Sequence, residues 1–232
     1  KDCKFRLDSV MENAYKYLKY LPMINSSEEN SYNKNNPYLS HLLVNRLLTK
    51  GSDKETRHFE ISLRDSGLMY EPGDSLGVLP FNCSEVVDDL MGTTGFTGSE
   101  EIKIAEETIC LKDALISRFA CTVLSKIQIK KFNELAQVSA LDDLLKIENK
   151  EALIEYMWGR ELIDLFKEYP QGELSVEDFV GLLRPMPPRL YSIASSLSTH
   201  HEEVHLTVAV VRYDTHGRKR KGVCSSYLAE RV

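Results

Sequence analysis

The segment RLYSIASS, residues 189–196, combines a cation, a phenol ring and a run of hydroxyl groups directly after two prolines. If the segment is a β-strand, alternation places Arg189 and Tyr191 on one face. Leu190 and Ser192 then lie on the other face. An arginine fork can bind a phosphate, and an aromatic ring beside it can stack on a planar group. Taken alone, the segment is more typical of an ordinary strand with a solvated arginine at its rim.

Short β-like runs lie on both sides of the middle of the chain. Residues 58–63, HFEISL, alternate apolar and polar side chains, which predicts a half-buried strand. A turn at Pro72 and Gly73 precedes another short apolar run, and VHLTVAVVRY at 204–213 also has β character. The segment LSHLLVNRLLT, residues 39–49, has leucines at helical spacing, so pattern alone leaves helix and strand open.

The region between these runs, residues 84–182, has a helical pattern. Its successive segments carry apolar residues at intervals of three and four, and Ser84, Ser125 and Ser175 are candidate N-caps. The sequence therefore predicts a split core, in which a long helical insertion separates two groups of strands.

The N-terminal region is expected to hold a helix and a linker. Apolar residues at helical spacing from Val10 to Leu21, followed by Pro22, predict one amphipathic helix. Residues 25–36 are polar and are interpreted as a linker. Because the first residue is not methionine, the chain is expected to be part of a longer protein.

Composition argues against several classes of function. With 29 basic and 35 acidic residues, the net charge is -6, so no global field draws the protein to nucleic acid or to an anionic membrane. The longest apolar runs are far shorter than the ~20 residues of a membrane span. The five cysteines are scattered and form no CxxC pair, which predicts reduced thiols in a cytoplasmic protein. His200, His201 and His205 lack a carboxylate or cysteine at ligand spacing, so no metal site is expected.

The C-terminal segment KGVCSSYLAERV, residues 221–232, has the composition of a phosphate-binding turn. Gly222 lets a backbone approach a ligand, and Ser225 or Ser226 is a candidate N-cap of a helix whose N-terminus favours an anion. The serine can equally be a simple cap. The preceding RKRK, residues 218–221, follows the turn DTHG; it could face a dinucleotide or an acidic partner, but is more typical of a solvated hairpin tip.

The chain resembles the diflavin reductase branch of the ferredoxin-NADP reductase family, over roughly residues 37–232. The features that carry the resemblance are, in order, PGDSLGVLP, the helical insertion, RLYSIASS, VHLTVAVVRY and GVCSSYLAERV. The resemblance implies an α+β fold: a flattened antiparallel Greek-key β-barrel that binds FAD, with an inserted all-α connecting domain. It also favours a strand for residues 39–49.

This resemblance implies a division of the chain into three parts. Residues 1–36 would form the N-terminal helix and polar linker. Residues 37–83 and 183–232 would form the FAD-binding barrel, and residues 84–182 the helical connecting domain.

The resemblance also assigns roles to individual residues. Arg189 would bind the FAD pyrophosphate, Tyr191 would stack on the isoalloxazine ring, and Ser192, the candidate catalytic residue, would lie near the flavin N5. Leu190 belongs to the same motif. The further residues implied to bind the cofactor are Thr207, Val208, Ala209 and Tyr213 on the next strand, the loop residues Gly222, Val223, Cys224 and Ser225, and Thr122 in the insertion.

The resemblance implies an NADPH-dependent flavoprotein oxidoreductase that passes electrons from NADPH through FAD to FMN or directly to an acceptor. FAD would bind to this chain. The last barrel strand, the NADPH-binding domain and an FMN domain or acceptor protein are expected outside it. Two alternatives stay open: a cytochrome- or oxygenase-linked reductase, and a non-catalytic docking module without flavin that uses RKRK as its contact.

Overall fold

The computed structural model describes residues 18–21, 32–172 and 174–232. Most of the expected N-terminal helix and polar linker lies outside the described residues. The part of that helix that is described, Leu18–Leu21, is strand β1, so the helical prediction is wrong there. Among the described residues, no helix is both long enough and apolar enough to cross a membrane.

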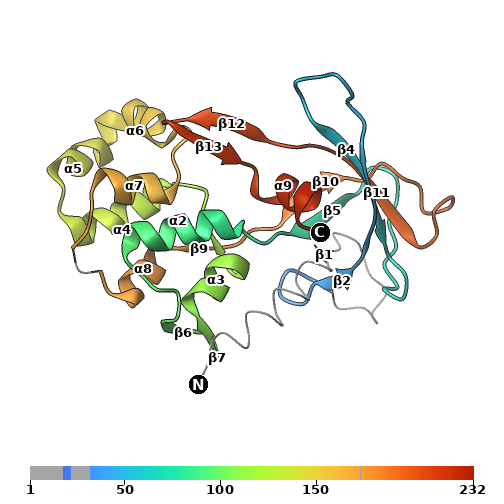
Figure 1. Cartoon of the computed structure of the whole chain (residues 1–232), viewed down its shortest axis with the longest axis horizontal. Coiled ribbons are helices and arrows are strands. Elements are labelled where there is room, and N and C mark those ends of the chain that lie inside the picture. The colour runs from blue at the N-terminus through green and yellow to red at the C-terminus, as the bar shows by residue number, and fades with distance from the viewer. Residues whose placement is uncertain (1–17, 22–31, 173) are drawn as a thin grey trace. The chain divides into compact units, whose positions relative to one another are not determined.

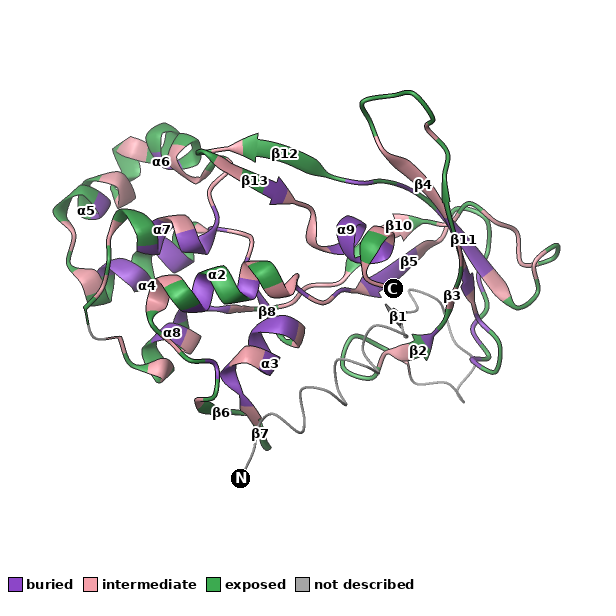
Figure 2. Cartoon of the chain, viewed as in Figure 1, coloured by how far each residue is buried: buried purple, intermediate pink, exposed green. Residues whose placement is uncertain are grey.

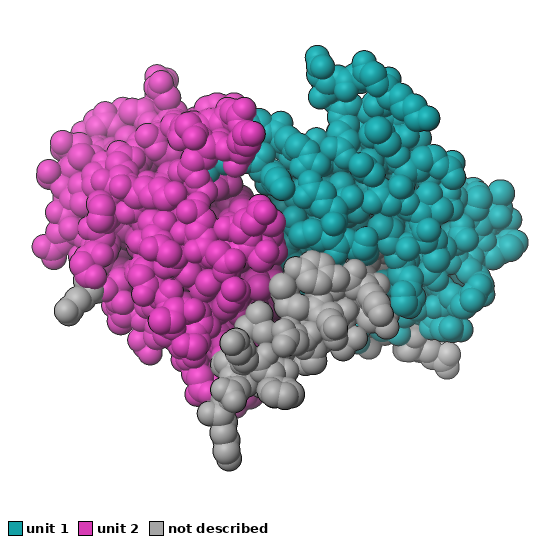
Figure 3. Space-filling model, in the orientation of Figure 1, with its two compact units in different colours: residues 1–81, 187–213, 220–232 teal, residues 82–186, 214–219 magenta. Residues whose placement is uncertain are grey.

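The chain divides into two compact units, coloured separately in Figure 3. Unit 1 comprises Lys1–Phe81, Pro187–Tyr213 and Arg220–Val232, and unit 2 comprises Asn82–Met186 and Asp214–Lys219. Each unit is therefore assembled from segments that are distant in sequence.

Unit 1 is built from antiparallel strands (Figure 1). One sheet has the strand order β10-β5-β1-β2, and a second has the order β11-β4-β3. An isolated bridge between Ile193 and Leu206 links β10 to β11. The strands are β2 (Tyr38–Ser40), β3 (Leu42–Leu47), β4 (Thr56–Ser62), β5 (Ser75–Leu79), β10 (Arg189–Ser192) and β11 (Glu203–Ala209).

The core of unit 1 follows the alternation of apolar residues. Phe59 and Ile61 on β4 are fully buried, as are their neighbours Val204 and Leu206 on β11. Figure 2 colours the two strands by burial. The strands predicted at 58–63 and 204–213 are thus confirmed for β4 and β11, and residues 39–49 form β2 and β3 rather than a helix. Helix α9 (Val223–Glu230) adds Cys224, Tyr227 and Leu228 to the same core.

Unit 2 contains the predicted helices. They are α2 (Ser84–Thr94), α3 (Leu111–Ser117), α4 (Lys126–Ala136), α5 (Ser139–Leu145), α6 (Lys150–Met157), α7 (Leu162–Glu168) and α8 (Val176–Leu182), with a 3-10 turn at Ile147–Asn149. Phe132, Phe166 and Phe179 pack in its core, with ring centroids 5.2 and 5.9 Å apart in successive pairs.

Unit 2 also holds short strands that the helical expectation omits. Strands β6 (Glu101–Ile104) and β7 (Glu107–Cys110) pair antiparallel, and so do β8 (Phe119–Ala120) and β9 (Arg184–Pro185). Ala105, at φ 53°, occupies the left-handed region in the β6–β7 turn. Strands of two to four residues contain too few alternations to register as a pattern.

The predicted helix caps are partly correct. Ser125 and Ser175 cap α4 and α8, because their side chains accept hydrogen bonds from the amides of Gln128 and Asp178. Ser84 is not a cap: Cys83 precedes the helix, and Ser84 is its first helical residue.

The segment RKRK is a strand rather than a solvated tip. It forms β13 (Arg218–Lys221), which pairs with β12 (Arg212–Thr215). The turn predicted at DTHG is confirmed, with His216 and Gly217 at φ 49° and 69°. Arg220 is only 2% exposed, so this cation is a structural residue.

The cysteines only partly match the expectation of reduced thiols. Cys83, Cys121 and Cys224 carry free thiols, and the last two are buried. Cys110 is disulfide-bonded, so the prediction is wrong for this residue.

Candidate functional site

Strand β10 presents the RLYS motif at the edge of the four-stranded sheet of unit 1. Arg189 pairs with Val78 and Tyr191 with Leu76 on β5, so the two side chains share the face that carries these buried residues. Arg189 is exposed, and among the described residues no carboxylate forms an ion pair with it. The arginine is therefore available for an external anion.

Tyr191 connects β10 to the start of α9. Tyr191 packs against the core cluster that contains Cys224, and the charge of Arg189 acts on both groups. Burial raises the pKa of Tyr191, and burial likewise raises the pKa of Cys224 to about 12. Both groups stay protonated at neutral pH, so Cys224 is not a thiolate nucleophile.

Helix α9 begins earlier than the sequence predicts. Its N-cap is Gly222, in an extended conformation, and the amide of Ser226 donates the first helical bond to Gly222 O at 3.0 Å. The prediction that Ser225 or Ser226 is the N-cap is therefore wrong. The amides of residues 223–225 lie in the first turn, where helix geometry provides no internal acceptor and the dipole favours an anion.

The hydroxyl of Ser225 has a structural role in this loop. It accepts a hydrogen bond from the amide of Val211 at 3.1 Å and lies 3.4 Å from Gly222 O. The amide of Gly222 in turn donates to Val211 O at 2.9 Å. These bonds tie the end of β11 to the start of α9, so the amides of this turn, rather than the Ser225 hydroxyl, are the groups available to a ligand.

Position 222 requires glycine because neighbouring atoms leave no room for a side chain. A Cβ atom at this position would lie 2.7 Å from Ser225 Oγ and 2.8 Å from Val211 Cβ. Replacing Gly222 with alanine is therefore expected to lower the free energy of unfolding by about 1–2 kcal/mol, because the packed loop must shift. Urea unfolding measures the loss. Gly181→Ala in α8 is the matched control, since its Cβ meets nothing within 4 Å, and equal stability of the two variants would contradict the contact.

The remaining predicted residues divide between the units. Thr207 and Ala209 are exposed on β11, while the side chain of Val208 is buried in the core and leaves only its backbone for a ligand. Tyr213 on β12 is 47% exposed. Thr122 belongs to unit 2, in the loop between β8 and α4, and is half-buried. The structure thus brings Arg189, Tyr191 and the start of α9 together and leaves Thr122 in the other unit.

Arg231 is a site residue that the sequence does not reveal. Its guanidinium donates to Phe81 O at 3.0 Å, Val223 O at 3.1 Å and Ser226 Oγ at 3.2 Å, and lies 5.6 Å from the centre of the Tyr227 ring. These contacts hold the first turn of α9 in place. No local pattern distinguishes this arginine from a solvated one, because Phe81 is 150 residues away in sequence.

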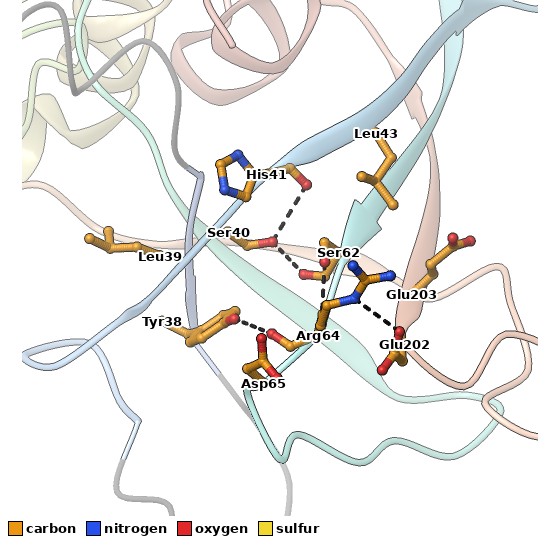
Figure 4. Close-up of a pocket in the computed structure, with 10 residues that line it drawn as sticks. All are labelled: Tyr38, Leu39, Ser40, His41, Leu43, Ser62, Arg64, Asp65, Glu202 and Glu203. Atoms are coloured by element: carbon orange, nitrogen blue, oxygen red, sulfur yellow. Dashed lines mark hydrogen bonds and ion pairs between the residues drawn. The ribbon is translucent and has the colours of Figure 1, made fainter.

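A pocket of ≈ 420 Å³ lies elsewhere in unit 1 (Figure 4). Its lining includes Tyr38, Ser40, Arg64, Glu202 and Glu203 and none of the residues predicted to bind the cofactor. Tyr38 donates a hydrogen bond to Arg64 O, and Arg64 forms an ion pair with Glu202 at 3.1 Å. The polar groups of this pocket are thus partly engaged with one another, and the pocket is distinct from the β10–α9 site.

Comparison with known proteins identifies relatives of this chain. The chain is 47% identical over 207 residues to the sulfite reductase [NADPH] flavoprotein alpha-component of Bacillus subtilis (strain 168). The aligned region covers 88% of this chain and 34% of the relative. It is 42% identical to the proteins of the same name from Vibrio parahaemolyticus, over 89% of this chain, and Zymomonas mobilis, over 87%. In both cases the match covers 33% of the relative. The chain therefore spans about a third of the length of these relatives.

A family model described as an FAD binding domain matches residues 30–227. The match includes both strand groups of unit 1, the helical segment between them, the RLYS motif and the first residues of α9. It confirms the resemblance that the ordered motifs predict. Since this match covers most of its length and includes the RLYS motif and the glycine-dependent turn at α9, the chain belongs to the FAD binding domain family.

Proposed function

We propose that this chain is the FAD-binding part of an NADPH-dependent diflavin oxidoreductase of the sulfite reductase flavoprotein type. The observation that carries the proposal is the convergence of Arg189, Tyr191 and the first turn of α9 within unit 1. The names and identities of the relatives support the same class of enzyme. NADPH, FMN and the electron acceptor are assigned to parts of the whole protein outside this chain.

The residues of the site fit a dinucleotide with a planar ring. Arg189 offers a charge without a carboxylate partner among the described residues, and the α9 turn offers amides at a helix N-terminus. Gly222 lets the chain pack closely against Val211 and Ser225 at the start of this turn, where a Cβ would clash. A pyrophosphate suits the first two groups, and an aromatic ring system suits Tyr191.

When bound, FAD supplies the redox chemistry, because it accepts two electrons as hydride and releases them one at a time. The chain supplies binding and orientation. Arg189 would neutralise the pyrophosphate, Tyr191 would stack on the ring, and Ser192, exposed at the end of β10, would lie near its N5. The assignment of Ser192 as catalytic rests on its place in the motif.

The other cofactor contacts belong to the same proposal. Thr207 and Ala209 project from the exposed positions of β11, and Tyr213 offers a second aromatic ring. Leu190, 52% exposed on β10, and Thr122 in unit 2 are assigned through their motifs.

The proposal includes the finer description of the fold. Residues 37–83 and 183–232 would form a flattened Greek-key barrel, and residues 84–182 an inserted connecting domain. Two antiparallel sheets joined by the Ile193–Leu206 bridge, with a largely helical unit between their strands in sequence, support this description.

The alternatives differ in their support. The relatives' names favour a sulfite reductase flavoprotein over a cytochrome- or oxygenase-linked reductase. A flavin-free docking module would use RKRK as its contact, but Arg220 is buried and Arg218 is bonded within unit 2. Neither arginine is therefore a free cation for a partner.

A flavin titration tests the proposal. The purified chain is mixed with FAD, dialysed to equilibrium and examined by visible absorption. We expect saturable binding of one FAD per chain with a perturbed flavin spectrum. A folded chain, as judged by circular dichroism, that stays colourless after dialysis would support the docking module and refute the proposed function.

A further inference from the structure

A cluster of histidine and glutamate side chains lies on the three-stranded sheet of unit 1, on the face opposite its apolar core. On β4, His58 and Glu60 alternate with the buried Phe59 and Ile61. Strand register pairs His205 of β11 with Glu60, so their side chains share that face. The members of the cluster are His58, Glu60, His200, Glu203 and His205.

The polar atoms of the cluster are close to one another. His58 Nε2 lies 3.2 Å from Glu60 Oε1, and the rings of His58 and His205 meet edge to face with centroids 5.2 Å apart. In the group formed by His58, Glu60 and His205, the three potential ligand atoms all lie within 4.8 Å of one another. Tetrahedral coordination with bonds of about 2.0–2.2 Å separates ligand atoms by roughly 3.4 Å, so only small side-chain movements are needed.

A second group shares His205. It comprises His200, Glu203 and His205, whose ligand atoms also lie within 4.8 Å of one another. Glu203 Oε2 lies 3.2 Å from His205 Nε2 and 3.7 Å from His200 Nδ1. Because both groups need His205, one ion per chain is expected. The expectation that His200 and His205 lack a carboxylate neighbour is therefore wrong, because Glu203 lies close to both rings in the structure.

The backbone around the first group is well fixed. His58 and Glu60 lie on β4, and His205 lies on β11, within a continuous seven-pair antiparallel ladder. The amide of His205 donates to Ser195 Oγ at 2.9 Å, and its carbonyl accepts from the amide of Ala194 at 2.8 Å. His200, by contrast, lies in the turn before β11. Rigid strands hold ligands in place better than a turn does, which favours the first group.

We propose that His58, Glu60 and His205 bind one divalent transition-metal ion of the zinc class. Two imidazoles and a carboxylate are a ligand set that suits Zn²⁺ and Co²⁺. The side chain of His205 is 10% exposed and that of His58 is 22% exposed, so the site is sheltered but open to an ion. Glu203 lines the pocket of Figure 4 and lies 3.2 Å from His205 Nε2, so this pocket adjoins the cluster.

The test is calorimetric titration of the tag-free chain with Zn²⁺. We expect one site per chain, and loss of at least about tenfold in affinity for His58→Asn and for Glu60→Gln. His201→Asn is the matched control, because this neighbouring exposed histidine belongs to neither group, and His200→Asn separates the two groups. Both of these variants should keep the wild-type affinity.

Co²⁺ substitution identifies the ligand atoms. Imidazole and carboxylate ligands give d–d bands without sulfur-to-cobalt charge transfer, whereas a thiolate ligand such as Cys83 would produce that band. Its appearance would overturn the proposal. So would the absence of saturable Zn²⁺ binding in the micromolar range, or full binding by a folded His58→Asn variant. Because the zinc titration contains no flavin, its result is independent of the flavin proposal.

Discussion

Replacing Arg189 with alanine is expected to weaken FAD binding by roughly 10- to 100-fold, because a charge-assisted hydrogen bond contributes about 1.5–3 kcal/mol. The arginine has no carboxylate partner among the described residues, so its removal breaks no internal ion pair. The fold should therefore keep its stability while the affinity falls. Equilibrium dialysis with FAD and thermal unfolding of the apoprotein measure the two quantities separately.

Two further substitutions sharpen this test. Arg64→Ala removes an equal charge from an exposed position of unit 1, and its affinity for FAD should equal that of the wild type. Arg189→Lys keeps the charge but loses the bidentate fork, so an intermediate affinity is expected. FAD binding by Arg189→Ala at wild-type affinity would refute the assignment of this residue.

Replacing Arg218 with alanine is expected to lower the free energy of unfolding of unit 2 by about 1–3 kcal/mol, because two sheltered carboxylates lose one of their hydrogen-bonding cations. The guanidinium lies 2.7 Å from Asp89 Oδ2 on α2, 3.1 Å from Asp164 Oδ1 on α7 and 3.5 Å from Glu161 Oε2. The side chains of Glu161 and Asp164 are only 6% and 10% exposed. Urea unfolding followed by far-ultraviolet circular dichroism measures the loss, since unit 2 holds most of the helices.

The neighbouring cation provides the control. Lys219 is exposed on the same strand, and Lys219→Ala should unfold at nearly the wild-type urea concentration. If the two variants were equally stable, the ion pairs of Arg218 would contribute nothing measurable, and the structural role assigned to the RKRK strand would be wrong.

The elements predicted correctly are those with many repeats of one period. Strand β4 alternates from His58 to Ser62, and the helices of unit 2 present repeated apolar faces. Strand β3 is ambiguous from its sequence because its leucine spacing fits both the helical and the strand period. The resemblance to the reductase family favours the strand. The β6–β7 pair was missed because four-residue strands give too little pattern. Ser84 has the composition of a cap, but the backbone begins its helix one residue earlier.

The residues of the site likewise divide into those that a local sequence pattern indicates and those that only the fold brings together. Alternation alone places Arg189 and Tyr191 on one face, but only the fold brings Cys224 close to Tyr191. The histidine cluster was missed because His58 and His205 belong to strands that are distant in sequence. A search for ligands at short spacing cannot find donors that become neighbours through sheet pairing.

The division of unit 1 into three chain segments has a consequence for synthesis on the ribosome. Strands β3 and β4 are made well before several of their partners: Arg64 bonds to a residue 138 positions later and Asn45 to one 184 positions later. Unit 2 has its full set of residues once Lys219 is made, whereas the core of unit 1 still needs Cys224, Tyr227 and Leu228. Until β11 is made, the pair formed by β3 and β4 lacks the strand that completes its sheet, so the edge of β4 that later binds β11 stays unpaired during synthesis.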